Sequence, residues 1–208
     1  MTAQPMTFSS RDDGEELARA ELYGLLARLW FAAPDEPLLA QFRVAVTQAP
    51  EPGGFLEAPW EHLVAALRES NVDTARAEYD ALFGGVGKPE VFLYGSHYLA
   101  GFLNEKPLAQ LRTDLAALGL TRDEQLGETE DHIAYGFELM RYLIAGDDVA
   151  VCNLEQQRRF FRAHLQPWLV LLCDAVLAHP HADTWRAVAE MTRQFVAVET
   201  QAFDLLES

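Results

Sequence analysis

The residues of this chain that are best suited to chemistry lie together in the acidic segment Glu128-Thr129-Glu130-Asp131-His132. Three carboxylates beside an imidazole form a site that attracts a cation. The alternative is structural, because carboxylates in the first turn of a helix are stabilised by the helix macrodipole, by about 0.3–1 kcal/mol each. The segment is therefore a candidate binding site, a helix cap, or both.

Helical spacing divides this segment between two faces of one helix, which we expect to run from about Glu130 to Ala145. Asp131 then shares a face with Tyr135, Glu138 and Tyr142. Carboxylates combined with tyrosines suit a ligand that is both cationic and apolar, so we expect Asp131 to contact such a ligand. His132 lies instead at the edge of the apolar face, where it would hold the site in shape or hydrogen-bond a neighbouring carbonyl.

The glycine-rich loop Gly84-Gly85-Val86-Gly87-Lys88 is similar to a phosphate-binding loop, whose backbone amides hold an anion ahead of a helix. The match is poor, because Pro89 stands where Ser or Thr is required and the loop follows a predicted helix rather than a strand. A glycine cap on the helix that ends at Phe83 explains the loop better. A nucleotide-dependent regulator that uses Lys88 is kept as an alternative hypothesis.

Other catalytic and metal-binding patterns are missing from the sequence. It contains no Glu-x-x-His and no His-x-x-x-His pair, which a di-iron or zinc site on helices would need. Ser96 lacks the Gly-x-Ser-x-Gly pattern of a hydrolase, and Cys152 and Cys173 fit no redox or zinc spacing. We therefore expect no enzymatic activity, no metal and no cofactor.

Composition favours a folded cytoplasmic protein with a cationic partner. The 208 residues are 50% hydrophobic, and their formal net charge is -16. Such a charge repels nucleic acid and anionic lipid, so we expect neither as a partner. The first fourteen residues do not form a signal peptide, and no apolar run approaches the roughly 18 residues of a membrane span. Unpaired cysteines fit a reducing compartment, and we expect no stable membrane insertion.

The elements that would position these residues are all helices. Apolar residues recur at i, i+3, i+4 and i+7, and Pro and Gly mark the breaks between segments. The predicted helices are Glu15–Phe31, Pro37–Thr47, Pro59–Glu69, Asp73–Phe83, Ser96–Leu103, Pro107–Gly119, Glu130–Ala145, Leu154–Gln166, Pro167–His179 and Asp183–Leu206. Glu90–Tyr94 is the one stretch that could be a strand. The sequence thus predicts an all-α bundle of about ten helices.

We expect residues 15–208 to form a single helical domain behind a flexible N-terminus of residues 1–14. Residues 120–127 are predicted to form a connector and a candidate hinge. This hinge would join two lobes, which consist of about residues 15–119 and 128–208. Within the second lobe, Trp168–Cys173 is apolar on every side, which predicts a helix enclosed by its neighbours.

Three stretches occur in an order and spacing that resemble a known family. Tyr79-Asp80-Ala81-Leu82-Phe83-Gly84 leads into the loop through Pro89, Glu128–His132 follows, and Phe160-Phe161 precedes Trp168. In these features the chain resembles the TorD/DmsD family of redox-enzyme maturation chaperones, from its first helix to its last. One departure is Glu130, which occupies the position of the family's proline and loosens the turn ahead of the acid-His pair.

The resemblance implies a non-enzymatic chaperone that binds the twin-arginine signal peptide of a molybdenum-cofactor oxidoreductase. It implies that the chaperone holds this apoenzyme in the cytoplasm until cofactor insertion is complete, before export. The residues that the resemblance implies for peptide binding are Glu128, Asp131 and His132, with Tyr79, Leu82, Phe83 and Ser96 as support from the first lobe. Tyr135 and Glu138, from the acidic and aromatic helix face, complete the predicted site.

Several alternatives stay open at this point. The client is a formate dehydrogenase-type or a sulfoxide reductase-type molybdoenzyme, and the chaperone is a monomer or a domain-swapped homodimer. A helical adaptor that recognises folded protein through an exposed helix face is a further alternative to leader binding.

Overall fold

A computed structural model describes residues 11–44, 53–84, 88–121 and 127–206. These residues form ten α-helices, and a π-helical segment, Phe161–Leu165, joins the eighth to the ninth. The helices are α1 (Arg11–Phe31), α2 (Glu36–Val44), α3 (Glu57–Glu69), α4 (Val72–Phe83), α5 (Gly95–Ala100), α6 (Lys106–Ala117), α7 (Ile133–Ala145), α8 (Leu154–Phe160), α9 (Gln166–Leu177) and α10 (Thr184–Leu205). The predicted all-α fold is confirmed.

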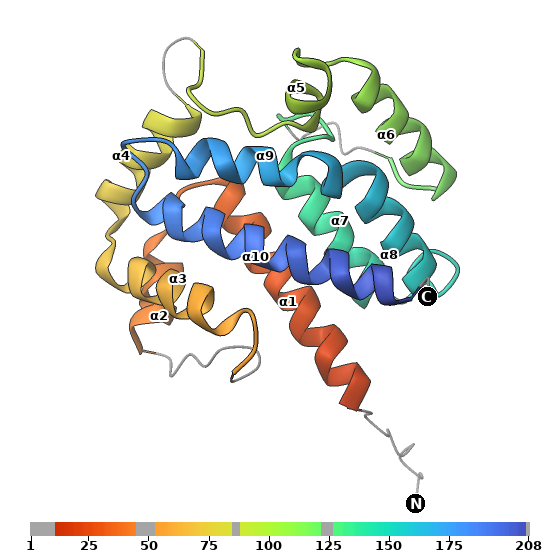
Figure 1. Cartoon of the computed structure of the whole chain (residues 1–208), viewed down its shortest axis with the longest axis horizontal. Coiled ribbons are helices and arrows are strands. Elements are labelled where there is room, and N and C mark those ends of the chain that lie inside the picture. Colours follow the sequence, from red (N-terminus) through yellow and green to blue (C-terminus); the bar gives the residue numbers. More distant parts are fainter. Residues whose placement is uncertain (1–10, 45–52, 85–87, 122–126, 207–208) are drawn as a thin grey trace, which may run out of the picture.

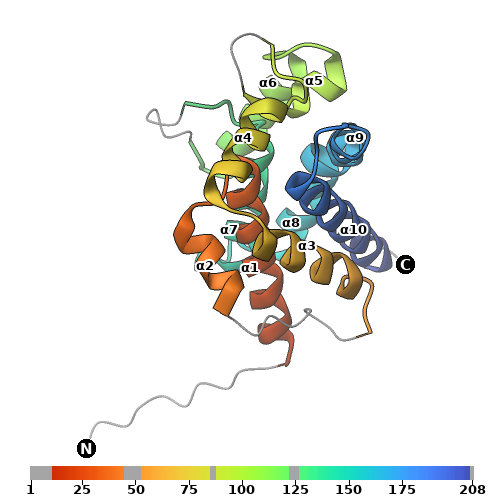
Figure 2. The same cartoon turned by 90° about the vertical axis from the view of Figure 1, so that its left-hand side faces the viewer.

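Two long helix pairs form the centre of the bundle. α1 packs along α7, and α10 packs along α9 (Figure 1). α1 also contacts α10, so that helices from both ends of the sequence are neighbours. α3 lies against α10, α2 lies against α3, and α5 with α6 covers one end of the molecule (Figure 2). Helices from both sides of the connector at 120–127 therefore share one core, while the division into two lobes stays a prediction.

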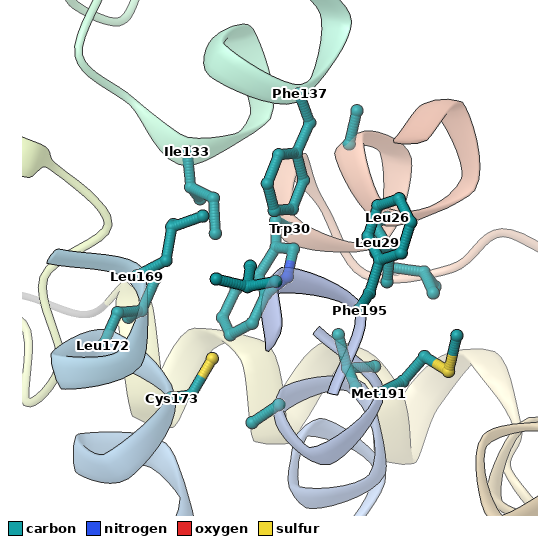
Figure 3. Close-up of a cluster of buried hydrophobic side chains, with 14 of the residues drawn as sticks. Leu26, Leu29, Trp30, Ile133, Phe137, Leu169, Leu172, Cys173, Met191 and Phe195 are labelled. Atoms are coloured by element: carbon teal, nitrogen blue, oxygen red, sulfur yellow. The ribbon is translucent and has the colours of Figure 1, made fainter. Parts of the chain in front are cut away.

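The core is built where four helices converge. Trp30 of α1, Phe137 of α7, Leu169 of α9 and Phe195 of α10 point toward one another (Figure 3) and are almost fully buried. One face of α10 is entirely buried, and it consists of Trp185, Val188, Ala189, Thr192, Phe195 and Val196. Burial of large apolar and aromatic side chains is the main source of stability in such a bundle.

Several predicted boundaries are wrong by a few residues. α1 begins at Arg11 instead of Glu15, and residues 1–10 lie outside the described ranges. Asn71, not Asp73, caps α4, because its side chain accepts hydrogen bonds from two amides of the first turn. The centre of the predicted hinge, residues 122–126, also lies outside the described residues.

The ninth helix is not enclosed as the sequence predicted. Val170 and Leu171 are 38% and 49% exposed, while Leu169 and Leu172 are fully buried. An apolar sequence on all sides of a helix therefore overstated its burial. The continuous helix Leu154–Leu177 has the length and mean hydropathy of a membrane span, although it contains no unbroken apolar run of that length. That criterion is equally met by core helices of soluble proteins, and α9 packs against α10 and the π-helical segment.

Candidate functional site

The acidic segment forms a turn that crosses the residues ahead of α5. Residues Tyr94 and His132 form an isolated antiparallel bridge, in which the Gly95 amide donates to the Asp131 carbonyl at 2.9 Å and the Ile133 amide donates to the Leu93 carbonyl at 2.9 Å. The extended stretch Glu90–Tyr94 thus makes one bridge and forms no strand within the described residues. This bridge fixes the acidic turn against the start of α5.

Asp131 lies in this turn, and it does not belong to the helix in which the sequence placed it. α7 begins at Ile133, three residues later than predicted, so the helical face shared by Asp131 and Tyr135 does not exist. The Asp131 carboxylate is 8% exposed and accepts hydrogen bonds from the Ser96 amide at 2.8 Å and the Thr129 hydroxyl at 2.7 Å. Its geometry is that of a residue that holds the acidic turn against the first turn of α5.

His132 is the N-cap of α7, and its ring Nδ1 accepts a hydrogen bond from the Ala134 amide at 3.2 Å. The ring is almost fully buried and meets the rings of Phe31, Tyr94 and Tyr135 at centroid distances of 6.1, 5.2 and 5.7 Å. Burial lowers the pKa of His132 to about 4, although nearby carboxylates oppose the shift. The imidazole is therefore neutral at pH 7. The core-edge position predicted for His132 is confirmed, but its partner is an amide and not a carbonyl.

Glu128 is the carboxylate at the start of the turn, and it accepts a hydrogen bond from the Tyr94 hydroxyl. Burial, followed by this bond and the charge of Glu128, raises the pKa of Tyr94 well above its ordinary value. Glu128 is only partly buried. Unlike the buried Asp131, Glu128 keeps access to solvent, so it is available to a cationic ligand.

An apolar groove of about 340 Å³ opens beside this turn, between α6, α7 and α8. Its size is within the range of ligand sites in proteins. Two predicted site residues, Tyr135 and Glu138, line it. The other lining residues are Leu111, Leu115, Leu120, Thr121, Glu130, Gly136, Leu139, Tyr142 and Phe160. The groove is thus an apolar channel with carboxylates and tyrosines on its walls, which is the chemistry that the sequence assigned to one helix face.

Ser96 lies on the other side of the turn from this groove. Its side chain is fully buried, and its hydroxyl has no hydrogen-bond partner among the described residues. It borders a separate small cavity of about 120 Å³ together with Asp131, His164 and Trp168. The structure therefore brings the Ser96 amide to Asp131, but it does not place Ser96 in the groove.

The three residues of α4 that were predicted to support the site pack against other parts of the protein. The Tyr79 hydroxyl donates to the Phe31 carbonyl at 2.7 Å, at the end of α1, and the Tyr79 ring packs on Phe83 at 5.0 Å. Leu82 is fully buried, and Phe83 packs edge-on against Trp30. These three residues join α4 to the core and to Phe31, whose ring contacts His132. The three α4 residues therefore act on the site indirectly, through the position of Phe31.

The glycine-rich loop that motivated the nucleotide hypothesis falls partly on residues 85–87, which lie outside the described residues. Lys88, at its end, has its ammonium 5.4 Å from the centre of the Phe92 ring. The nucleotide hypothesis therefore stays untested.

Sequence reasoning did not find several residues of the site. Tyr94 and Thr129 hydrogen-bond the acids, and Arg112 forms a two-point ion pair with Glu130 at 3.0 and 2.8 Å. Leu111 and Leu115 supply a groove wall from α6. Their four-residue spacing on a predicted helix was the signal available, but nothing in the sequence indicated which helix α6 would face.

Comparison with known proteins identifies the family. Residues 54–174, more than half of the chain, match the sequence profile of a family described as the nitrate reductase delta subunit. Two proteins named chaperone protein TorD, from El Tor Inaba and Classical Ogawa strains of Vibrio cholerae serotype O1, are 28% and 26% identical over 204 and 205 residues. Each alignment covers 90% of this chain and 93% of the relative. The chain belongs to the TorD/DmsD family of redox-enzyme maturation chaperones.

A solved structure supports the fold of this family member. It is that of a proposed redox enzyme maturation protein from Archaeoglobus fulgidus, with a TM-score of 0.55 and 16% identity over 95% of this chain and 99% of the other. The relatives are named as chaperones or maturation proteins and not as enzymes. This family member is accordingly a redox-enzyme maturation chaperone.

Proposed function

We propose that this chaperone works in the cytoplasm, where it binds the twin-arginine signal peptide and the apo form of a molybdenum-cofactor oxidoreductase. It holds the client until the cofactor has been inserted and then releases it for export. The proposal rests on the family membership and on one structural observation. That observation is the apolar groove between α6, α7 and α8, with carboxylates on its walls and the Glu128–His132 turn beside it.

The groove matches the chemistry of such a peptide, which carries two guanidinium groups followed by an apolar segment. Tyr135, Leu139 and Phe160 offer apolar and aromatic surface for the segment. Glu138 is 46% exposed at the groove, and Glu128 lies nearby in the acidic turn, so both carboxylates are within the path of an approaching cation. The client's apolar segment would supply affinity and its arginines selectivity.

The energies support this division of labour. An exposed ion pair contributes about 0–1 kcal/mol, so two arginines alone cannot hold a peptide. Burial of about 300–400 Å² of apolar surface contributes roughly 8–10 kcal/mol before the entropy of ordering the peptide is subtracted. Modest affinity is therefore expected, with carboxylates acting mainly on the association rate through long-range attraction.

Calorimetry with a synthetic peptide tests the assignment. The probe carries an Arg-Arg pair followed by an apolar segment, and Leu139→Gln places an amide on the groove wall. We expect the affinity to fall by about tenfold, equivalent to about 1.4 kcal/mol. The matched control is Leu154→Gln, because Leu154 is 45% exposed and does not line the groove.

A second variant tests the carboxylates. Glu138→Gln should slow association at low ionic strength and leave dissociation nearly unchanged, which surface plasmon resonance can resolve. Wild-type affinity in Leu139→Gln together with an unchanged association rate in Glu138→Gln would remove the groove from consideration. Binding of the mature client without its leader would instead favour an adaptor.

A further inference from the structure

The helix α6 forms one wall of the groove but is weakly attached to the bundle. Among the described helices, α6 packs broadly only against its neighbour α5. It buries two side chains, Leu108 and Leu111, whereas α10 buries eleven residues. Burial of few apolar side chains is the property of segments that open at low free-energy cost.

A glycine turn lies on each side of α6. Gly101, ahead of the helix, has φ of +81°, and Gly119, behind it, has φ of +73°. Residues with a side chain rarely adopt these backbone angles, so glycine allows the chain to turn sharply at both points. The wall is thus a short helix between two turns, and its position depends on the contacts that α6 makes across the groove.

One hydrogen bond and one ion pair attach α6 to neighbouring elements. Asp114 accepts from the His164 ring at 2.8 Å, which joins α6 to the π-helical segment. Arg112 reaches across to Glu130 with two parallel bonds, Nε to Oε1 at 3.0 Å and Nη2 to Oε2 at 2.8 Å. Arg112 is 50% exposed, while Glu130 is only 12% exposed and lines the groove. Glu130 is therefore part of the site, and Arg112 belongs to α6, the weakly attached wall.

The two-point geometry shows what Glu130 can recognise. A carboxylate that accepts two parallel bonds is matched to the planar guanidinium group, and an ammonium cannot reproduce this arrangement. Arg141 also pairs with a carboxylate of the groove, Glu138, but both residues belong to α7 and so do not join two walls. The pair between Arg112 and Glu130 is different, because opening it gives a second guanidinium access to the Glu130 carboxylate and also removes one of the contacts that hold α6.

We propose that Arg112 is an internal occupant of an arginine subsite on Glu130 and that it latches α6 across the groove until an arginine of the peptide replaces it. This inference rests on the proposed function, since the competing ligand is the arginine pair of the client's leader. It adds that Glu130 is a specificity residue and that peptide binding moves α6. The chaperone thereby discriminates against apolar peptides without arginine, which do not displace the latch.

Hydrogen exchange and calorimetry on Arg112→Gln test the latch. The control is Arg28→Gln, which changes the net charge equally and breaks an exposed pair with Asp35 at 2.7 Å, and neither residue lines the groove. Without peptide, amides of α6 should exchange faster in Arg112→Gln than in Arg28→Gln. With the Arg-Arg probe peptide, Arg112→Gln should bind about three- to fivefold more tightly than Arg28→Gln, since an exposed pair is worth up to about 1 kcal/mol.

Glu130→Gln should weaken binding of the Arg-Arg peptide and leave binding of a matched peptide with Lys-Lys nearly unchanged. Equal exchange of α6 in Arg112→Gln and Arg28→Gln, or equal affinity of these two variants, overturns the latch. If the wild type binds the peptide and the two variants are equal, the proposed function survives without the latch. If neither the wild type nor Arg112→Gln binds the peptide, both proposals are refuted.

Discussion

Replacing Asp131 by alanine separates its structural role from a role in ligand binding. The sequence assigned Asp131 to the ligand, but the carboxylate is 8% exposed and both of its oxygens accept internal hydrogen bonds. The donor at Ser96 is a backbone amide of a fully buried residue. In Asp131→Ala this amide loses its partner where water does not readily replace it.

The size of the loss can be worked out from these contacts. A hydrogen bond to a charged group contributes about 1.5–3 kcal/mol to stability, and a buried donor left without a partner costs about 1–3 kcal/mol. Both figures describe the loss of the same hydrogen bond, so they are not added. We therefore expect Asp131→Ala to lower the free energy of unfolding by about 1.5–3 kcal/mol. Thr129→Val is the matched control, because it removes the second donor and leaves the bond to Ser96 intact. Its expected loss is smaller than that of Asp131→Ala, because Thr129 is only partly buried and water can replace its hydroxyl.

Urea denaturation at pH 7, followed by circular dichroism, measures both variants, and calorimetry with the Arg-Arg peptide is run below their unfolding transitions. Unfolding free energy of Asp131→Ala within about 0.5 kcal/mol of wild type, combined with lost peptide binding, would refute the structural role. The carboxylate would then be a ligand contact, as the sequence suggested.

Two other predictions follow from burial. Because the pKa of His132 is about 4 in the folded chain and about 6.5 unfolded, the unfolded state binds more protons between these values, so this residue reduces stability as the pH falls from 6.5 toward 4. Between pH 7 and pH 5 this residue lowers the free energy of unfolding by about 2 kcal/mol. His132→Asn keeps a capping side chain and should remove that part of the pH dependence in urea titrations. An unchanged slope would contradict the neutral buried imidazole. Leu172→Ala should lower the free energy of unfolding by about 2–5 kcal/mol and Leu171→Ala by less than about 1 kcal/mol, because Leu172 is fully buried and Leu171 is 49% exposed; equal losses would contradict the orientation of α9.

The sequence predicted the helices well because their signals are local. Apolar periodicity located all ten, and proline or glycine set most of their ends to within a few residues. The start of α7 was the consequential error. Glu130 and Asp131 are compatible with a first helical turn, but a long-range bridge between Tyr94 and His132 holds them outside the helix. That bridge spans residues far apart in the sequence, and no local pattern predicts it.

The candidate site was predicted in composition but not in arrangement. Carboxylates and tyrosines do lie together, yet the groove takes Tyr135 and Glu138 from α7 and its opposite wall from α6. Which helix faces α7 is decided by tertiary packing, which periodicity does not determine. Arg112 was overlooked for the same reason, since its partner Glu130 is eighteen residues away and joins a different element.

Burial divides the acidic turn into two groups with different tasks. Asp131 and His132 are inside, where each accepts a backbone hydrogen bond, so substitutions there act on the fold and on ligand binding at once. Glu128 and Glu138 reach solvent, and Glu130 faces the groove under Arg112. Variants of these outer acids, measured beside Asp131→Ala, therefore report on recognition with little effect on stability. If the site were instead centred on Asp131, the outer acids would be dispensable, and the salt dependence of peptide binding would survive their removal.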